Sequence, residues 1–239
     1  VNDLLDKAKI EAGKLNLESI PFSWNDIYPE LKTNLTSTLE SKDREGCIGV
    51  RFVHATDVPD QMEGDPHRII QIFTNLLNNA LKFTEKGQIV CRIDLKRVSA
   101  RNIVLDCSVE DTGIGMTAEQ QADLFKDFVQ ADSSVSRKYG GTGLGLVISR
   151  SLVNLMGGDI SVESEVGKGT CFRFELNLSP CSNNDSWIEY RKKNIQQTLN
   201  IGWIDQSSTR AAAFSELLPE LGLVPDTYED LDAISGVLY

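Results

Sequence analysis

Apolar residues recur every three or four positions in some segments and every second position in others, which predicts helices and strands, respectively. The first segment, residues 1–16, has an apolar stripe at helical spacing, formed by Leu4, Leu5, Ala8, Ala12 and Leu15. We expect an amphipathic helix that continues one begun earlier, so the chain is interpreted as an internal fragment whose missing partner helix covers this stripe. A surface helix that packs on its own domain is the alternative.

Two longer helical periods follow a short apolar strand at residues 21–24. In the first, isoleucine and leucine residues recur every four positions from Ile27, and Pro29 can be accommodated only in the first turn. The second begins at Asp65, because Asp caps open amides and the Pro that follows suits the first helical position. We expect this second helix to end at residues 86–87.

Strict alternation of apolar and polar residues predicts strands in the rest of the first 178 residues. They cover residues 47–53, 89–95, 103–109, 160–162 and 172–178. Shorter helical patterns open at Thr117, with a capping box, and at Gly143. Helices laid on one mixed, mostly antiparallel sheet predict an α+β fold, a two-layer sandwich with the helices on one face.

The composition changes after Ser179. Residues 180–198 are interpreted as a linker, and residues 199–239 begin with a short buried strand and a helix, as a βα-repeat domain does. We therefore divide the chain into residues 1–17, 18–179, 180–198 and 199–239.

Composition narrows the class of protein. The 41% of hydrophobic and 25% of charged residues are typical of a soluble globular protein, and a net charge of −11 argues against a nucleic-acid partner. No stretch of about eighteen apolar residues occurs, so we expect a cytoplasmic fragment, with any membrane anchor of the parent protein outside this stretch. Cys91, Cys107 and Cys171 lie in strand patterns and are expected to be buried, reduced thiols.

The first candidate functional residues lie in the helical segment that follows Thr74. Asn75 and Asn79 are four apart and share one helical face, and Lys82 lies about one turn further. Amide oxygens suit a hard cation such as Mg²⁺, and a lysine can reach a phosphate. Taken alone, such a set is usually a solvated helix face.

Three glycine-containing segments follow. Asp111 ends an apolar strand and precedes Gly113 and Gly115, which permit close backbone approach, so the carboxylate could accept the exocyclic amine of adenine. Residues 140–145 are glycine-rich and open onto a helix, a typical phosphate site. Residues 167–170, taken alone, indicate a hairpin turn.

In this order, the four segments resemble the N, G1, G2 and G3 boxes of the histidine-kinase branch of the GHKL ATPase family, which also holds DNA gyrase B, Hsp90 and MutL. Residues 124–132 resemble the F box through Phe125 and Phe128. The first helix resembles the end of the dimerisation helix that carries on from the phospho-accepting histidine. The likeness, to a sensor kinase of the hybrid type, covers roughly residues 1–178.

The resemblance implies the Bergerat fold, with ATP and Mg²⁺ as cofactors. Asn79 would hold Mg²⁺ with Asn75 beside it, and Lys82 and Arg137 would face the phosphates, which makes these four the catalytic set. Phe83 would border the adenine or the ribose.

The same resemblance implies the rest of the nucleotide site. Asp111 would bind the adenine amine, and Thr170 would help through a water molecule. Residues 116–140 would form a lid over ATP. The other positions implied to bind ATP are Gly113, Gly115, Lys138, Gly141, Thr142, Gly143, Leu144 and Gly145.

One residue helps to choose the reaction. ATP-hydrolysing members of the family often have a water-activating Glu at the position of Asn75, and a neutral amide is a poor base. We therefore predict transfer of the γ-phosphoryl group to a histidine, which would lie upstream, because neither His54 nor His67 lies in a dimerisation helix.

The expected partners are the dimerisation and histidine-phosphotransfer domain of the same protein, as a homodimer, and a receiver domain. The isolated fragment is expected to lack autophosphorylation. Asp205 ends the first strand of the receiver-like piece without a second acid beside it, which fits a degenerate receiver or a true receiver with one acid missing. A module that binds ATP without phosphotransfer, and an ATPase clamp that Asn75 argues against, are the alternative functions.

Overall fold

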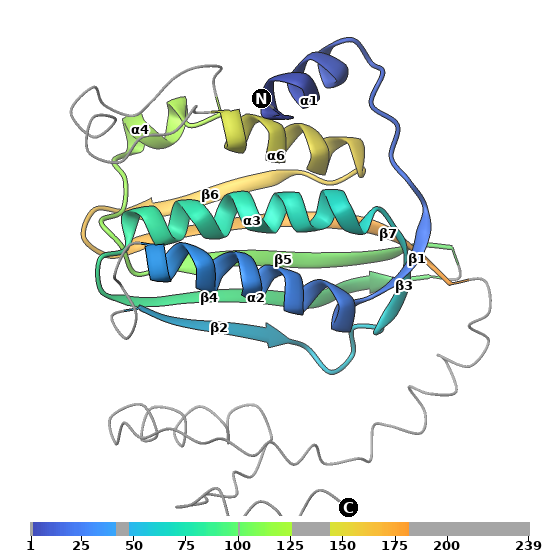
Figure 1. The fold of residues 1–239 in the computed structure, drawn as a ribbon, viewed down its shortest axis with the longest axis horizontal. Helices are drawn as coiled ribbons and strands as arrows, with labels where there is room; N and C mark the ends of the chain where they lie inside the picture. The colour runs from blue at the N-terminus through green and yellow to red at the C-terminus, as the bar shows by residue number, and fades with distance from the viewer. Residues whose placement is uncertain (1, 42–47, 100, 126–143, 182–239) are drawn as a thin grey trace, which may run out of the picture. The chain divides into compact units, whose positions relative to one another are not determined.

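The computed structural model describes residues 2–41, 48–99, 101–125 and 144–181 (Figure 1). The chain divides into two compact units, residues 1–184 and 185–239, and all the described residues belong to the first. The predicted receiver-like piece and most of the predicted linker lie outside the described residues, so these domain boundaries remain predictions.

One mixed sheet of seven strands forms the base of the first unit. Its strands are β1 (Ile20–Ser23), β2 (Ile48–His54), β3 (Gln61–Gly64), β4 (Gly87–Val98), β5 (Ile103–Asp111), β6 (Ile160–Glu165) and β7 (Gly169–Pro180). The order is β1-β3-β7-β5-β4-β2, and β6 also pairs with β7. Among these pairs only β2 and β4 are parallel, so the predicted mixed, mostly antiparallel sheet is confirmed.

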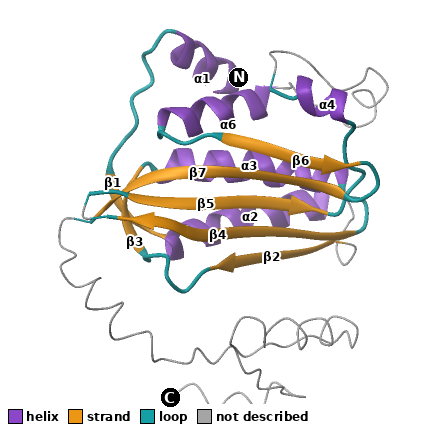
Figure 2. Cartoon of the chain, turned by 180° about the vertical axis from the view of Figure 1, so that it is seen from behind, coloured by secondary structure: helices purple, strands orange, loops and turns teal. Residues whose placement is uncertain are grey.

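Among the described residues, helices cover one face of this sheet and no helix lies on the other face, which is called the open face below (Figures 1 and 2). They are α1 (Asn2–Glu11), α2 (Trp24–Ser41), α3 (Pro66–Phe83), α4 (Ala118–Asp123) and α6 (Leu144–Leu155). The predicted α+β two-layer sandwich is therefore confirmed. The core lies between the layers, where the ring of Phe73 on α3 meets that of Phe174 on β7 at 5.1 Å between centroids.

The open face of the sheet carries cross-strand ion pairs, together with a few apolar side chains such as Val90 and Val104. Lys96 pairs with Glu175, and Arg173 donates a hydrogen bond of 2.8 Å to Asp106. Successive residues of a strand point to opposite faces, so the apolar residues between these charges face the helices. The alternation of residues that predicted the strands therefore reflects the two faces of the sheet, one packed against the helices and one that carries the ion pairs.

The start of α3 forms as its sequence predicts. Pro66 is the first helical residue, and one carboxylate oxygen of Asp65 accepts from the Arg68 amide at 3.0 Å. The other oxygen accepts from the Glu18 amide at 3.0 Å, so the same side chain also anchors the segment after α1. The predicted end is wrong: α3 ends at Phe83, and Gly87 opens β4 instead.

Two other boundaries differ from the prediction. The first helix stops at Glu11, because Gly13 adopts a left-handed φ of 62° and the Lys14 amide bonds back to the Lys9 carbonyl, a helix-ending turn. Pro29 lies in the second turn of α2, not the first, since α2 begins at Trp24. Pro29 has no amide hydrogen to donate to the carbonyl of Asn25, four positions earlier. Asn25 is exposed, so water can bond to that carbonyl instead.

The remaining local predictions have mixed outcomes. The capping box of Thr117 with Gln120 is confirmed. Cys91 and Cys107 are buried, and burial raises the pKa of the Cys91 thiol to about 12. Cys171 is only half-buried, because the strand alternation places it on the open face. No helix in the described part of the chain is both long enough and apolar enough to span a membrane.

Candidate functional site

The end of α3, the end of β5, the start of α6 and the start of β7 meet at one end of the sheet (Figure 1, left). All of the predicted site residues that the structure describes lie on these elements or on the loop after β5. The topology causes this convergence, because α3 and β5 both run toward this end while α6 and β7 both start from it.

Asn75, Asn79, Lys82 and Phe83 are half-buried on the second half of α3. The side-chain nitrogen of Asn75 donates to the Gly145 carbonyl at 3.1 Å, so Asn75 contacts the first turn of α6. The ammonium of Lys82 lies 4.9 Å from the centre of the Phe83 ring, a cation–π distance. The structure therefore brings Asn75 beside the start of α6, while Asn79 and Lys82 lie further along α3.

Asp111 is a buried carboxylate at the last position of β5, on the sheet face that the helices cover. Its Oδ1 accepts from the Gly113 amide at 2.8 Å and lies 3.5 Å from the Thr84 hydroxyl. Burial raises the pKa of Asp111, and the hydrogen bonds from Gly113, Thr84 and the Thr170 amide only partly oppose this rise. A carboxylate held in this way favours a ligand that brings a hydrogen-bond donor.

The loop after Asp111 is wedged between α3 and the turn that joins β6 to β7. The Ile114 amide donates to the Phe83 carbonyl at 3.2 Å, and the Gly167 amide donates to the Ile114 carbonyl at 2.8 Å. A Cβ on Gly113 would overlap that Phe83 carbonyl, and a Cβ on Gly115, whose φ is 66°, would overlap the carbonyl of Glu165. Both glycines are thus required by close packing of backbone on backbone.

Thr170 lies directly opposite Asp111 in the pairing of β5 with β7. Its hydroxyl is 2.9 Å from that of Ser164, which also accepts from the Met116 amide at 2.8 Å. Thr170 is 8% exposed and Asp111 is 6% exposed, so the two share one small polar region in the apolar layer. The predicted proximity of Thr170 to Asp111 is what the register produces.

The glycine-rich segment is described only where α6 begins. Leu144 is buried, and Gly145 lies against the side chain of Asn75. The rest of the predicted lid and phosphate positions lie outside the described residues, namely Arg137, Lys138, Gly141, Thr142, Gly143 and residues 126–140.

Sequence reasoning missed three hydroxyl groups near these residues: those of Thr84, Ser149 and Ser164. Ser149 is completely buried on α6 and bonds to Asn75 at 3.2 Å. One signal could have identified it, since a serine inside an apolar stripe needs a polar partner from another element. Thr84 and Ser164 gave no such signal, because their partners depend on how the loops pack.

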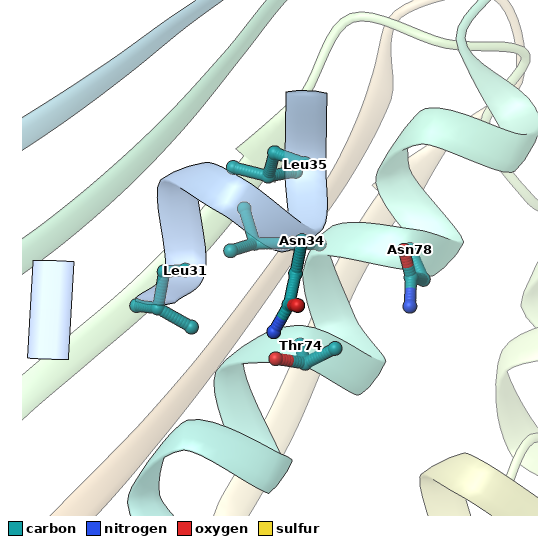
Figure 3. Close-up of a pocket in the computed structure, with 6 residues that line it drawn as sticks. Leu31, Asn34, Leu35, Thr74 and Asn78 are labelled. Atoms are coloured by element: carbon teal, nitrogen blue, oxygen red, sulfur yellow. The ribbon is translucent and has the colours of Figure 1, made fainter. Parts of the chain in front are cut away.

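A separate pocket lies between α2 and α3 (Figure 3). It has about 140 Å³ of space and is lined by Leu31, Asn34, Leu35, Thr74, Leu77 and Asn78. Small-molecule sites usually have volumes of about 300–1,000 Å³, so this pocket is too small for a nucleotide. It also lies on the α2 side of α3, whereas Asn75 faces α6.

Comparison with known proteins matches this arrangement to one family. Residues 64–180 match the family described as histidine kinase-, DNA gyrase B-, and HSP90-like ATPase. This match includes α3, β5, α6 and β7, the elements that meet at the candidate site.

Similar proteins cover most of the chain. The signal transduction histidine-protein kinase BarA of Escherichia coli K12 is 40% identical over 93% of this chain, and the sensor histidine kinase GacS of Pseudomonas protegens is 46% identical over 74%. The chain spans 24% and 19% of the lengths of these two relatives. The crystal structure of full-length ShkA in complex with AMPPNP covers 98% of this chain, and this chain covers 46% of it, with a TM-score of 0.68 and 24% identity, which shows a shared fold.

Proposed function

Residues 64–180 belong to the histidine kinase-, DNA gyrase B-, and HSP90-like ATPase family, and we propose that this chain is the ATP-binding catalytic part of a hybrid sensor histidine kinase. It would transfer the γ-phosphoryl group of ATP to a histidine outside this chain, for relay to a receiver aspartate. The observation that carries the proposal is the buried carboxylate of Asp111, which lies at the last position of β5 and next to Thr84 at the end of α3.

The base of the nucleotide would be read by Asp111. A strand-end carboxylate with neutral partners can accept the adenine amine without first breaking an ion pair. Thr170, opposite in the sheet, would support the base through a water molecule, and Phe83 would border the base or the ribose. Gly113 and Gly115 would keep the loop thin enough for the base to approach.

The phosphates would lie between α3 and the start of α6. The described residues contain no cluster of three or more His, Cys, Asp or Glu side chains that could hold a metal ion. A metal here would therefore depend on amide oxygens, phosphates and water, a donor set that fits Mg²⁺. Asn79 would hold the ion, with Asn75 beside it, and bound Mg²⁺ would neutralise charge on the phosphates.

Positive charge for the phosphates would come from Lys82 on α3 and from Arg137 and Lys138 in the segment before α6. The remaining contacts would be backbone amides at residues 141–145, at the start of α6, where helix amides favour an anion. These roles position the phosphates without adding a base.

Phosphoryl transfer is favoured over hydrolysis by the identity of residue 75. A neutral amide does not deprotonate water, and the nitrogen of Asn75 is engaged with α6. Catalysis would then consist of positioning and charge stabilisation. The nucleophile would come from a histidine-phosphotransfer domain of the same protein in a homodimer. Leu4 and Leu5 of α1, which are 57% and 55% exposed, suit a partner helix of that domain.

A reconstitution experiment tests the proposal. The chain would be incubated with Mg²⁺, γ-labelled ATP and a separately produced histidine-phosphotransfer domain of a related kinase. We expect labelled phosphohistidine on that domain, and none with the chain alone. At ATP concentrations well below saturation, Asp111→Asn should reduce the labelling by about 10- to 150-fold. Asp106→Asn, which changes a carboxylate of the same strand on the open face, should leave the labelling unchanged.

The same experiment separates the alternatives. ATP binding without phosphohistidine would identify a binding module and overturn the kinase proposal. Steady release of phosphate without the histidine domain would identify an ATPase clamp.

A further inference from the structure

Ser149 on α6 carries a hydroxyl group near the site and is 0% exposed. Its oxygen lies 2.9 Å from the Gly145 carbonyl, one turn earlier in the same helix, and 3.2 Å from the side-chain nitrogen of Asn75. That nitrogen also lies 3.1 Å from the Gly145 carbonyl. The three groups therefore form a closed ring of hydrogen bonds between α3 and α6.

Donor and acceptor capacity fixes the direction of each bond. The serine hydroxyl donates its one hydrogen to the Gly145 carbonyl and uses a lone pair to accept from Asn75. The amide nitrogen of Asn75 uses one hydrogen for Ser149 and the other for Gly145. A flipped amide would place its oxygen against the Gly145 carbonyl oxygen, two acceptors with no proton between them. The ring thus commits the amide nitrogen to α6 and leaves the amide oxygen for a ligand.

We propose that Ser149 is a positioning residue for phosphoryl transfer, which acts through Asn75 by holding its amide oxygen toward the metal and phosphates. This inference rests on the function proposed above, because only a nucleotide bound between α3 and α6 gives that oxygen something to orient. Ser149 also ties the first turn of α6 to α3.

Loss of the Ser149 hydroxyl should affect catalysis more than ATP binding. The base and the rest of the triphosphate would still be held, so the dissociation constant for ATP should change less than about twofold. The rate of phosphoryl transfer should fall about three- to tenfold, the range for one neutral hydrogen bond. A purely structural role would instead lower the rate and the affinity together with the melting temperature.

The test compares Ser149→Ala with a matched control in the same helix. Ser151 makes the same type of bond, from its hydroxyl to the Val147 carbonyl at 2.9 Å, and has no recorded contact with α3 among the described residues. Ser151→Ala should therefore leave transfer and ATP affinity unchanged. Ser149→Cys, which replaces the hydroxyl by a somewhat larger group that is a weak donor and a weak acceptor, should fall between wild type and Ser149→Ala.

An NMR measurement on the nucleotide-free chain reads the ring directly. The side-chain NH₂ group of Asn75 should show two hydrogen-bonded protons that exchange slowly with solvent. In Ser149→Ala one of them should lose protection, while in Ser151→Ala both should remain. Unchanged Asn75 signals in Ser149→Ala would overturn the inference.

Phosphoryl transfer by double variants completes the test. If Ser149 acts through Asn75, then Ser149→Ala should cause no further loss of rate in an Asn75→Ala background. Additive losses would overturn the positioning role. If wild type transfers no phosphoryl group while the Asn75 protons behave as expected, the ring stands and the proposed function fails.

Discussion

Two carboxylates near opposite ends of α3, the half-buried Asp6 and the buried Asp111, have different kinds of partner in the fold. Near the start of α3, Asp6 of α1 accepts from Arg68 at 2.7 Å and from Gln71 at 3.0 Å. Burial alone would raise the pKa of Asp6, but these hydrogen bonds and the charge of Arg68 outweigh it, so the pKa is lowered. Near the other end, Asp111 has only amide and hydroxyl partners, and burial keeps its pKa raised.

The contrast separates a structural acid, Asp6, from Asp111, the acid that we propose binds the base. The negative charge of Asp6 has a cation from the same chain and helps to hold α1 on α3. None of the groups that shift the pKa of Asp111 is a cation. Its negative charge would therefore be stabilised further only when a ligand donates a hydrogen bond to it. Binding sites generally tolerate such unfavourable burial, and the rest of the fold offsets it.

The largest expected effect is on the ligand. Asp111→Asn should weaken ATP binding by about 1.5–3 kcal/mol, or about 10- to 150-fold, because a charged hydrogen bond to the base is lost. Isothermal titration with ATP and Mg²⁺ measures this loss, with Asp106→Asn as the control. If the two variants bind ATP equally well, then Asp111 is not the residue that reads the base.

A smaller effect is expected on folding when the structural acid loses its cation. Arg68→Ala should lower the free energy of unfolding by about 1–2 kcal/mol, since it leaves a mostly buried carboxylate without its charged partner. Urea unfolding measures the change. Glu11→Ala is the matched control. Glu11 pairs with Lys7 within α1 and is exposed, so this ion pair should contribute less than about 0.5 kcal/mol to the free energy of unfolding. Equal losses in the two variants would remove the distinction between Asp6 and a surface acid.

The smallest effect is in the pH dependence of stability, where the two acids should act with opposite signs. Asp6 binds its proton more weakly in the folded chain than in the unfolded chain. Its contribution to the free energy of unfolding is therefore complete above pH 3.8 and is lost as the pH falls through its lowered pKa. Asp111 binds its proton more tightly when folded, so stability declines as the pH rises from 3.8 through its raised pKa.

Urea unfolding across this range, in wild type and in each Asp→Asn variant, separates the two contributions. Asp111→Asn should remove the decline with rising pH, and Asp6→Asn should remove the loss on acidification. If the slope of the free energy of unfolding against pH changes in the same direction in both variants, then folding does not shift the pKa values of the two acids in opposite directions.

The sequence predicts features whose causes are local and misses those that depend on contacts from afar. The cap of α3 follows from Asp65 and Pro66, which are adjacent, and the structure confirms it. The apolar stripe predicts a first helix up to residue 16, but Gly13 ends that helix, and Leu15 is buried in the core from the following segment. β3 is missed because its four residues are a strand only through their pairing with β1 and β7.

The candidate site divides in the same way. The positions of Asn75 and Asp111 on one helix and one strand could be predicted from period and motif order. The direction of the Asn75 amide could not, because it depends on Ser149, a residue 74 positions away. The burial of Asp111 likewise depends on Thr84 and on the pairing of β7 with β5.

The sheet with one open face has a consequence for how this chain should vary among its relatives. Along β5, Asp106 points to solvent while Cys107, its neighbour, is sealed beneath the helices. A replacement at the first position costs little and can be accepted by drift, whereas a replacement at the second disturbs every side chain packed around it. Divergence along this strand should therefore be faster at Asp106 and Glu110, the two residues of β5 that are not buried, than at its buried positions.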